Sequence, residues 1–354
     1  MRNLYLPIIG IFIVFTLIAL SVTFLNIQVL GTWSDLLADK IINITHYMWQ
    51  QLFSIDKLEY LVILTACFVI DLIFLGFNKS ALNNLLKPDP STKSDIYIFI
   101  IGLIGLRHYF LMFSFLLVGY YSSIWVDANL AFNWLHSLNS PILQLLVYLL
   151  IYDFADYWIH RSAHRISWWW EIHRFHHSAT KFNIITVARS HPLDLAFANF
   201  ITIIPLAILG VPIEQLFIIS VLRSMLGKMQ HSMVNWDFGL IGKFLIMSPV
   251  AHRIHHSPYP EHWDKHYGHT FIFWDRLFGT YYSGNFINDR VGLSNTTDNQ
   301  KGLIYDISMG QINFFKAFFL KKWSFKEGVM SEADIERYSI ENPQIHKVSD
   351  KRCN

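Results

Sequence analysis

Charge and cysteine are both scarce in this chain of 354 residues. Only 15% of the residues are charged, whereas 53% are hydrophobic and 16% aromatic, which excludes an ordinary soluble globular protein and a long disordered scaffold. The 28 basic and 26 acidic side chains leave a formal charge of +2, too small a cationic surplus for nucleic-acid binding. Cys67 and Cys353 provide neither a disulfide framework nor a thiolate metal site.

Several catalytic motifs are also missing. No Gly-x-Gly-x-x-Gly follows a strand pattern, and no cysteine set can hold an iron–sulfur cluster or a haem. The His-Glu-x-x-His signature of zinc proteases is absent because His160, His173 and His252 are each followed by Arg. The Glu-x-x-His pattern of soluble di-iron bundles is absent as well. A redox enzyme of this sequence therefore needs a separate electron donor.

Long apolar runs are abundant instead. The first run has no charged residue and, at about 22 residues of about 1.5 Å each, is long enough to cross a hydrocarbon core of roughly 30 Å. A fifth stretch, Leu193–Leu222, is interrupted by Pro205, Gly210 and Pro212, which predicts a re-entrant helical hairpin. The four runs predicted to be transmembrane helices are Leu4–Leu25, Tyr60–Phe77, Ile96–Tyr120 and Pro141–Ile159.

Basic residues give these helices an orientation. Lys79, Lys87 and Lys93 lie between the second and third runs, whereas Tyr121–Ser140 contains no Lys or Arg. By the positive-inside rule the first of these segments is cytoplasmic and the second is not, which places both termini and the end of the fourth run in the cytoplasm. The sequence thus predicts an all-α integral membrane protein of about four transmembrane helices, a re-entrant hairpin and a cytoplasmic helical cap.

Three regions follow from this pattern. Residues 1–140 are predicted to form an N-terminal transmembrane region, residues 141–285 a catalytic region, and residues 286–354 a polar cytoplasmic tail. In the tail, Ile312–Trp323 mixes bulky apolar residues with three lysines. This segment is either an amphipathic helix at the membrane surface or a helix packed on its own domain.

Histidine is the unusual residue of the chain. Thirteen of its 17 histidines fall between His160 and His269, and eight of them have helical spacing. Residues three or four apart share one face of a helix, so each group presents its rings together. Because one zinc takes about four ligands, eight or more imidazoles imply two metals, and imidazole suits iron, zinc, copper and nickel alike. The three groups are His160 and His164; His173, His176 and His177; and His252, His255 and His256.

Other residues near these groups have two interpretations each. His191 and His231 stand at the two feet of the predicted hairpin, where they are either further ligands or hydrogen-bonded helix-end residues. Asp156 precedes His160 by one turn and could accept a proton from a ligand ring; Asp153 could do the same or pair with an arginine.

Two further sets of side chains lie near these histidines in the sequence, three histidines in a loop and three consecutive tryptophans. His262, His266 and His269 occupy a polar loop, where we expect solvent exposure or contacts with substrate rather than metal ligation. Trp168–Trp170 is typical of an interfacial aromatic belt.

These motifs together resemble those of the fatty acid hydroxylase and sterol desaturase superfamily of membrane di-iron enzymes, in its bacterial sterol-desaturase-like branch. The resemblance covers roughly residues 145–282. Two positions depart from the family pattern: His266 stands where Asn usually precedes Tyr-Gly, and Asp194 stands where Glu usually follows His-Pro-x. The matching segments are DFADYWIHRSAH (153–164), HRFHH (173–177), RSHPLD (189–194), QHS (230–232), HRIHH (252–256) and DKHYGHTFIFWDRLFGTY (264–281).

The resemblance implies a site for two iron ions that uses dioxygen as co-substrate to hydroxylate or desaturate a lipid. It also implies a separate electron donor, such as a reductase with a b-type cytochrome or a ferredoxin. We expect hydroxylation of an unactivated C–H, with desaturation by the same site as the alternative. The ligands that it implies are His160, His164, His173, His176, His177, His252, His255 and His256, with His231 and His191 at positions that recur in the sterol-type branch.

Two other classes of histidine-rich protein fit this sequence less well. A metal transporter also concentrates histidine, but it needs ligands near the bilayer midplane and on both sides of it, whereas these gather at one face. A metal-dependent hydrolase needs only about three protein ligands. The sequence does not distinguish sterol, fatty acyl, ether lipid, sphingolipid or carotenoid substrates.

Overall fold

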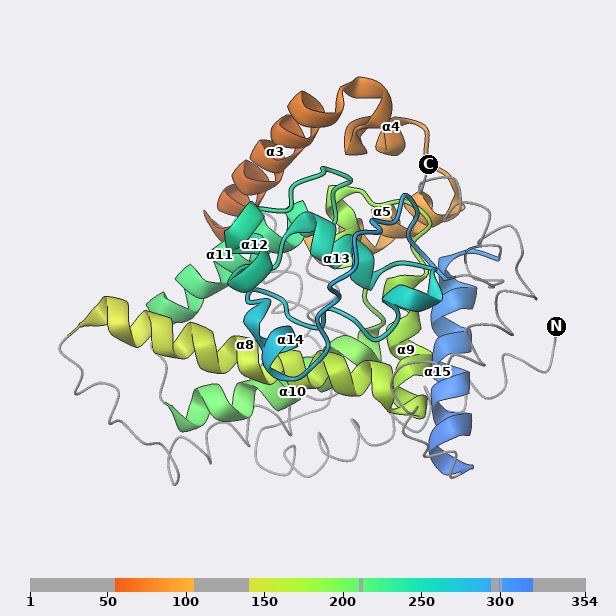
Figure 1. Ribbon diagram of the computed structural model, residues 1–354. Helices are drawn as coiled ribbons and strands as arrows, with labels where there is room; N and C mark the ends of the chain where they lie inside the picture. Colours follow the sequence, from red (N-terminus) through yellow and green to blue (C-terminus); the bar gives the residue numbers. More distant parts are fainter. Residues whose placement is uncertain (1–54, 105–139, 210–212, 294–298, 300, 321–354) are drawn as a thin grey trace, which may run out of the picture.

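The computed structural model describes residues 55–104, 140–209, 213–293, 299 and 301–320 (Figure 1). Within these ranges the regular elements are helices, and one isolated bridge joins Ile246 to Phe271. The predicted first span lies outside the described residues, as does the third beyond residue 104. The α-helices of the described residues are α3 (Ile55–Leu75), α4 (Ala81–Leu86), α5 (Pro90–Leu103), α8 (Pro141–Arg165), α9 (Ser167–His177), α10 (Pro192–Ile208), α11 (Ile213–Gln230), α12 (Gly239–Phe244), α13 (Pro249–His255), α14 (Phe273–Leu277) and α15 (Leu303–Phe319).

Three helices begin with the same local signal, a capping side chain followed by proline. Asp89 caps α5, Ser140 caps α8 and Ser248 caps α13, and each side chain accepts a hydrogen bond from the backbone amide three residues later. Proline at the first helical position has no amide hydrogen to leave unpaired, and such a cap contributes about 1 kcal/mol. This signal fixes where the histidine-bearing helices α8 and α13 begin.

Helix α8 is the candidate membrane span among the described residues. It is 25 residues long and is the helix there that is both long and apolar enough to cross a bilayer. Large apolar side chains such as Ile142 on α8 and Val62 and Ile73 on α3 are exposed, as lipid-facing side chains are. The helical class is confirmed for the described part of the chain, and the count of four spans stays a prediction.

The predicted hairpin corresponds to two helices. Helices α10 and α11 together cover Leu193–Leu222, and α10 packs against α8 while α11 packs against α3 and α13. The interruption comes after Ile208, next to Gly210 and Pro212. The expectation that Pro205 also breaks the helix was wrong, because α10 continues three residues beyond it.

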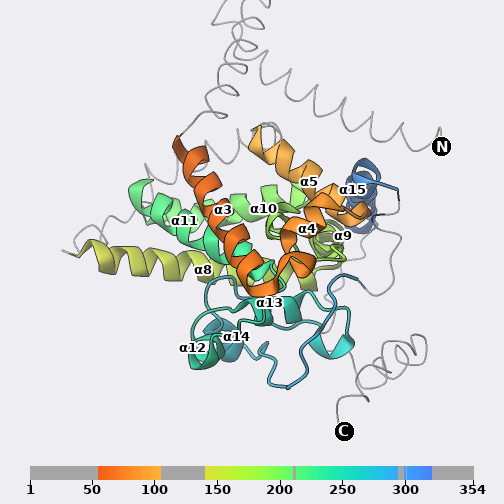
Figure 2. The same ribbon diagram turned by 90° about the horizontal axis from the view of Figure 1, so that it is seen from above.

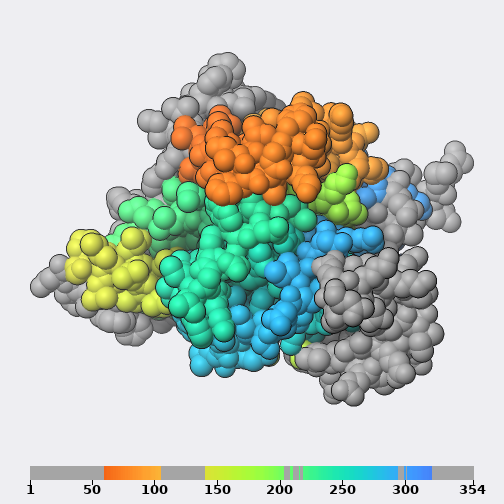
Figure 3. Space-filling view, turned by 45° about the horizontal axis from the view of Figure 1, so that its top comes forward, coloured from red at the N-terminus to blue at the C-terminus, as the bar shows by residue number. Residues whose placement is uncertain are grey.

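The C-terminal helix α15 lies along α9 (Figure 1). Phe314 is buried and contacts the edge of the Trp168 ring at 5.5 Å between ring centroids. Of the two alternatives for Ile312–Trp323, the described part, up to Leu320, is the helix that packs on its own domain. The short helices α12, α13 and α14 gather on one side of the longer ones (Figure 2), and on the face shown in Figure 3 the segment carrying them adjoins α3 to α5.

Candidate metal centre

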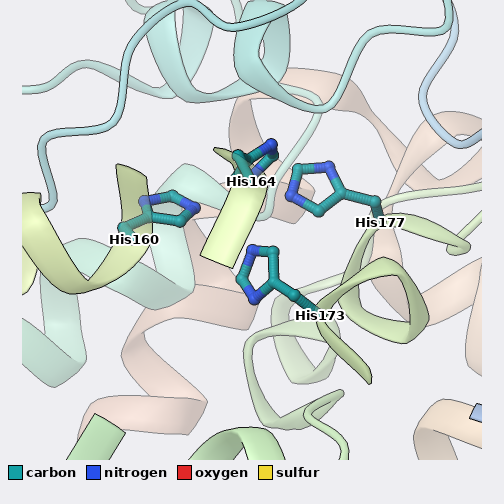
Figure 4. Close-up of side chains that lie close together, drawn as sticks. All are labelled: His160, His164, His173 and His177. Carbon is teal, nitrogen blue, oxygen red and sulfur yellow. The ribbon is translucent and has the colours of Figure 1, made fainter. Parts of the chain in front are cut away.

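Two groups of histidines lie in the interior where α8, α9, α11 and α13 meet. Within each group the candidate ligand atoms all lie within 4.8 Å of one another. We call them group A and group B. Group A consists of His160 and His164 from α8 and His173 and His177 from α9 (Figure 4); group B consists of His176 from α9, His231 after α11, His252 from α13 and His256 directly after it.

Group A and group B adjoin each other. His177 of group A and His256 of group B stack with ring centroids 4.1 Å apart, and both belong to a third set with His255. His255 also approaches group A, with ring centroids 4.4 Å from His160 and 4.7 Å from His164. The structure therefore brings together nine of the ten histidines that the sequence marked as ligands.

Most of these rings are held from outside by an oxygen atom. Nδ1 of His160 donates to the carbonyl oxygen of Tyr267 at 2.9 Å, and Nδ1 of His255 donates to that of Lys265 at 2.8 Å. Because a carbonyl oxygen only accepts, Nδ1 carries the proton and Nε2 keeps its lone pair. In group B, Nδ1 of His176 donates to the Arg189 carbonyl and that of His231 to the Gly227 carbonyl, both at 2.8 Å.

The inward-facing nitrogens fit a bound metal. Nε2 of His160, His173, His177 and His255 is buried and has no hydrogen-bond partner among the described residues. Nε2 of His231 and Nε2 of His252 face each other at 3.3 Å. Buried polar atoms are rarely left without a partner, and a neutral imidazole with its outer nitrogen hydrogen-bonded is the usual form of a metal ligand. This donor set fits two metal ions, one in each group.

The environment keeps these rings neutral. Burial lowers the pKa of His231 to about 4, although its hydrogen bond to the Gly227 carbonyl raises it. Neutral imidazole is the form that binds metals, so ligation at neutral pH requires no proton release from these rings. Burial first and neighbouring imidazoles second lower the pKa well below 6.5 for His176, His177, His252, His255 and His256.

Asp194 is the carboxylate that contacts a candidate ligand. Its Oδ2 lies 2.9 Å from Nδ1 of His173, and its Oδ1 accepts a hydrogen bond from the Trp169 indole at 2.8 Å. A carboxylate in this position orients the ring and increases its basicity. Sequence reasoning gave Asp194 no role. The available signal was an acid in the first turn of α10, two residues after Pro192.

Arg189 is fully buried and hydrogen-bonds to both α5 and α9. Its guanidinium donates to Asp95 at 2.8 Å and to the Phe175 carbonyl at 2.9 Å, while its own carbonyl accepts from His176. Asp95 belongs to α5, so this ion pair joins the N-terminal helices to the metal centre. Sequence reasoning did not identify it, because its two partners are 94 residues apart.

None of His191, Asp153 and Asp156 contacts groups A and B; for His191 and Asp153 the structure shows the second of the two alternatives. His191 is outside both groups: its Nε2 donates to the Ile307 carbonyl at 3.0 Å and its Nδ1 accepts from the Leu193 amide. Asp153 pairs with Arg223 at 2.7 Å, which is the alternative considered for it, and Asp156 also pairs with Arg223. In the structure the carboxylate beside a candidate ligand is instead Asp194.

The expected solvent exposure of the loop histidines was wrong for two of the three. His262 and His266 are buried, and His262 hydrogen-bonds to Ser257 at 2.8 Å. His266 binds the Ala251 carbonyl at 3.0 Å and accepts from the Tyr282 amide, with a left-handed φ of 59°. Asn tolerates that conformation better than most residues, which explains its usual place in the family pattern at this position.

The tryptophans are not a simple interfacial belt. Trp169 is buried through its bond to Asp194, and the ring of Trp170 lies 5.0 Å from that of His164. The expectation was wrong for Trp169, because the N-terminal half of α9 packs against α15 and α10, and it stays a prediction for the half-buried Trp168 and Trp170. These side chains support the metal centre from one side.

Comparisons with known proteins agree with this geometry. Residues 145–280 match the profile of the fatty acid hydroxylase family. Ornithine lipid hydroxylase of Rhizobium tropici is 29% identical over 47% of this chain and 47% of its own length. Alkylglycerol monooxygenase of Danio rerio is 33% identical over 36% of this chain and 28% of its own length. Methylsterol monooxygenase 2-2 of Arabidopsis thaliana is 33% identical over 39% of this chain and 52% of its own length.

The matched region carries every histidine of groups A and B. Over this region the chain is similar to lipid hydroxylases and monooxygenases of the fatty acid hydroxylase and sterol desaturase superfamily. It spans about half or less of the length of these relatives. No solved structure matches the chain.

Proposed function

We propose that this protein is a membrane-bound oxygenase that hydroxylates an unactivated C–H of a lipid. In this proposal residues 141–285 form the catalytic region. The single observation that supports it most strongly is the pair of adjoining groups, A and B, in which the Nε2 atoms of His160, His173 and His177 are buried and lack a hydrogen-bond partner among the described residues. Lipid hydroxylases and monooxygenases among the relatives support the same class of reaction.

Groups A and B hold two iron ions in this proposal. Bound iron would supply the activation of dioxygen, with two electrons from a separate donor such as a reductase with a b-type cytochrome or a ferredoxin. The chain itself contributes orientation and exclusion of water. Asp194 and the carbonyls of Tyr267, Lys265, Arg189 and Gly227 fix the ligand rings, and burial keeps the centre dry.

The proposal includes a membrane orientation. In this proposal groups A and B and both termini are cytoplasmic, which the positive-inside rule supports through Lys79 and Lys87, on either side of α4, and the basic residues after α8. A lipid then reaches the centre from the bilayer, and electrons reach it from the cytoplasm. Cysteine labelling from either side of sealed vesicles, with single cysteines at Lys79 and Arg290, tests this orientation.

Comparative lipid analysis tests the reaction. Cells that express the protein should contain a lipid that has gained one oxygen atom, and cells expressing His176→Ala or His255→Ala should lack it. A lipid that has lost two hydrogens would identify a desaturase instead. Protein purified without oxygen should contain about two irons per chain. Unchanged lipids together with a metal-free protein would contradict the proposal.

A further inference from the structure

A cavity of about 420 Å³ lies between α8 and α11, within the size range of small-molecule binding sites. We call it the α8/α11 cavity. Neither the metal centre nor the lipid chemistry described so far accounts for its lining. Its walls are formed by Tyr152, Val187, Ile219, Ser220, Arg223, Ser224 and His269.

Both helices lead from this cavity to the metal centre. On α11, Ser220, Arg223, Ser224 and Gly227 are three or four residues apart, so they share one helical face, and His231 continues the same series. Arg223 precedes His231 by eight residues, about 12 Å along a helix. Tyr152 on α8 precedes His160 by the same number of residues.

Burial increases along this face toward the centre. Ser220 is exposed, Ser224 is half-buried, and Gly227 is buried. A Cβ at Gly227 would lie 3.3 Å from Val187 Cγ2 and 3.6 Å from His269 Nε2, so the walls meet there. The Gly227 carbonyl in turn holds His231 of group B. The lining of the cavity thus runs from the exposed Ser220 inward to Ser224 and His269, and the same face of α11 continues through Gly227 to His231.

The surface of the cavity is mostly apolar, but Arg223 and His269 add polar groups to its inner wall. Arg223 is held by Asp153, Asp156 and Thr270, so its charge is already balanced by two carboxylates. Nδ1 of His269 is buried and has no hydrogen-bond partner among the described residues. A hydrocarbon chain would leave that nitrogen unsatisfied, and an anionic group would be repelled by the two aspartates.

We propose that the α8/α11 cavity binds a neutral polar group of the lipid substrate, a hydroxyl or an amide, at His269 and Arg223. A hydroxyl donates or accepts, so it suits either tautomer of His269. This inference rests on the proposed function and narrows its substrate class. The carbon that is oxidised then lies close to the polar end of the lipid, on the order of 12 Å or less from the bound group, and not at the remote end of a hydrocarbon tail.

Binding of two matched probes tests the cavity without turnover. Hexadecan-1-ol and hexadecane differ by one hydroxyl, and the concentration dependence of the thermal unfolding temperature gives the affinity of each for the purified, metal-containing protein. We expect the alcohol to bind about tenfold more tightly. In His269→Leu this preference should disappear. Equal affinities in the unmodified protein, or an unchanged preference in His269→Leu, would overturn the proposal.

Two further variants guard against a folding defect in His269→Leu. Ser220→Phe enlarges a side chain at the exposed end of the cavity and should weaken alcohol binding about tenfold while leaving the metal content at its normal value. Leu222→Ala, on the outward face of α11 where the side chain is 52% exposed, should change neither. Normal alcohol binding in Ser220→Phe would count against this cavity.

The position of the new oxygen separates this inference from the proposed function. Fragmentation of the product lipid should place the oxygen near the polar group. An oxygenated lipid carrying the oxygen far along its tail would overturn the cavity proposal and leave the oxygenase proposal standing. Absence of any oxygenated lipid would contradict the oxygenase proposal, and the probe comparison would still decide whether the cavity binds polar groups.

Discussion

Groups A and B are assembled by the chain in different ways. All four histidines of group A come from two consecutive helices, α8 and α9, which are separated by the single residue Ile166. Group B draws on α9, the segment after α11, and α13 with the residue that follows it, from His176 to His256. Group A therefore depends on one local turn, whereas group B depends on the packing of distant segments.

The hydrogen bonds that hold the histidine rings from outside also differ between the two groups. Group A has a carboxylate, Asp194, on His173, in addition to the Tyr267 carbonyl on His160. The outer hydrogen bonds of group B go to backbone carbonyls, those of Arg189 and Gly227. A side-chain support can be removed by one substitution, but a carbonyl moves only with its backbone. The comparison indicates that group A is sensitive to single side chains and group B to the tertiary structure.

The largest effect is expected where the groups meet. His177→Ala removes a ligand of group A that also stacks on His256 of group B, so we expect loss of both metals and of all product. Metal analysis of the purified variant should find fewer than one ion per chain, with an unchanged helical circular dichroism spectrum. The same measurement on His262→Ala, a buried histidine outside both groups, should find two ions per chain. Two retained ions in His177→Ala would disprove the shared centre.

Removing a ligand that belongs to one group alone should release about one metal ion per chain instead of both. In His173→Ala the metal of group A should be lost, and in His252→Ala that of group B, so each variant should retain about one ion per chain. Under the proposed function product should be absent in both variants, because dioxygen activation would require both metals. Metal analysis combined with the lipid assay gives the result. Loss of both ions from either variant would show that the groups do not bind metal independently.

The difference between the groups also explains which parts of the candidate metal centre could be predicted from the sequence. The spacing of His160 and His164, and of His173, His176 and His177, is enough to place each set on one helical face. The spacing does not divide a triplet between two groups: His176 faces group B while its neighbours face group A. His191 was marked by its position in the sequence, but the turn before α10 directs its ring toward the Ile307 carbonyl of α15.

Residues with distant partners escaped prediction altogether. Asp194 contacts His173 across 21 residues, and Arg189 contacts Asp95 across 94. Local periodicity carries no information about such pairs. The loop of His262 and His266 looked solvent-exposed because it is polar, yet both rings are buried and hydrogen-bond to Ser257 and to the Ala251 carbonyl of α13. Composition predicts burial poorly where a loop packs over a metal centre.

A smaller effect on the metals is expected at Asp95, which pairs with the Arg189 that holds His176 of group B. Asp95→Asn leaves the buried Arg189 guanidinium without its counter-charge, which should destabilise the protein by about 3–5 kcal/mol. Because the Arg189 carbonyl holds His176, metal in group B should be released more readily than metal in group A. Chemical unfolding and stepwise chelation measure the two effects.

Thr186→Ser is the matched control for Asp95→Asn. It keeps the hydroxyl that donates to Asp95 at 2.8 Å, so stability and metal release should stay near those of the unmodified protein. A second variant, Thr186→Val, removes this hydrogen bond and the one that the hydroxyl accepts from the Asn183 amide, and should cost about 2 kcal/mol. If Asp95→Asn releases metal equally from both groups, the link from α5 to group B through Arg189 is not the support described above.

The smallest effect is expected at the support of group A. Asp194→Asn keeps the size of the side chain and its hydrogen bond from Trp169, but it removes the charge beside Nδ1 of His173. Loss of such a carboxylate weakens metal binding about 10- to 100-fold, and here it should weaken only the metal of group A. Chelator titration should show one ion leaving earlier and the other unchanged, while Asp237→Asn, an acid of the loop before α12, should change neither. An Asp194→Asn variant that released the group B metal first would reverse the assignment, because the carboxylate would then act on the centre through the packing of α10 and not through His173.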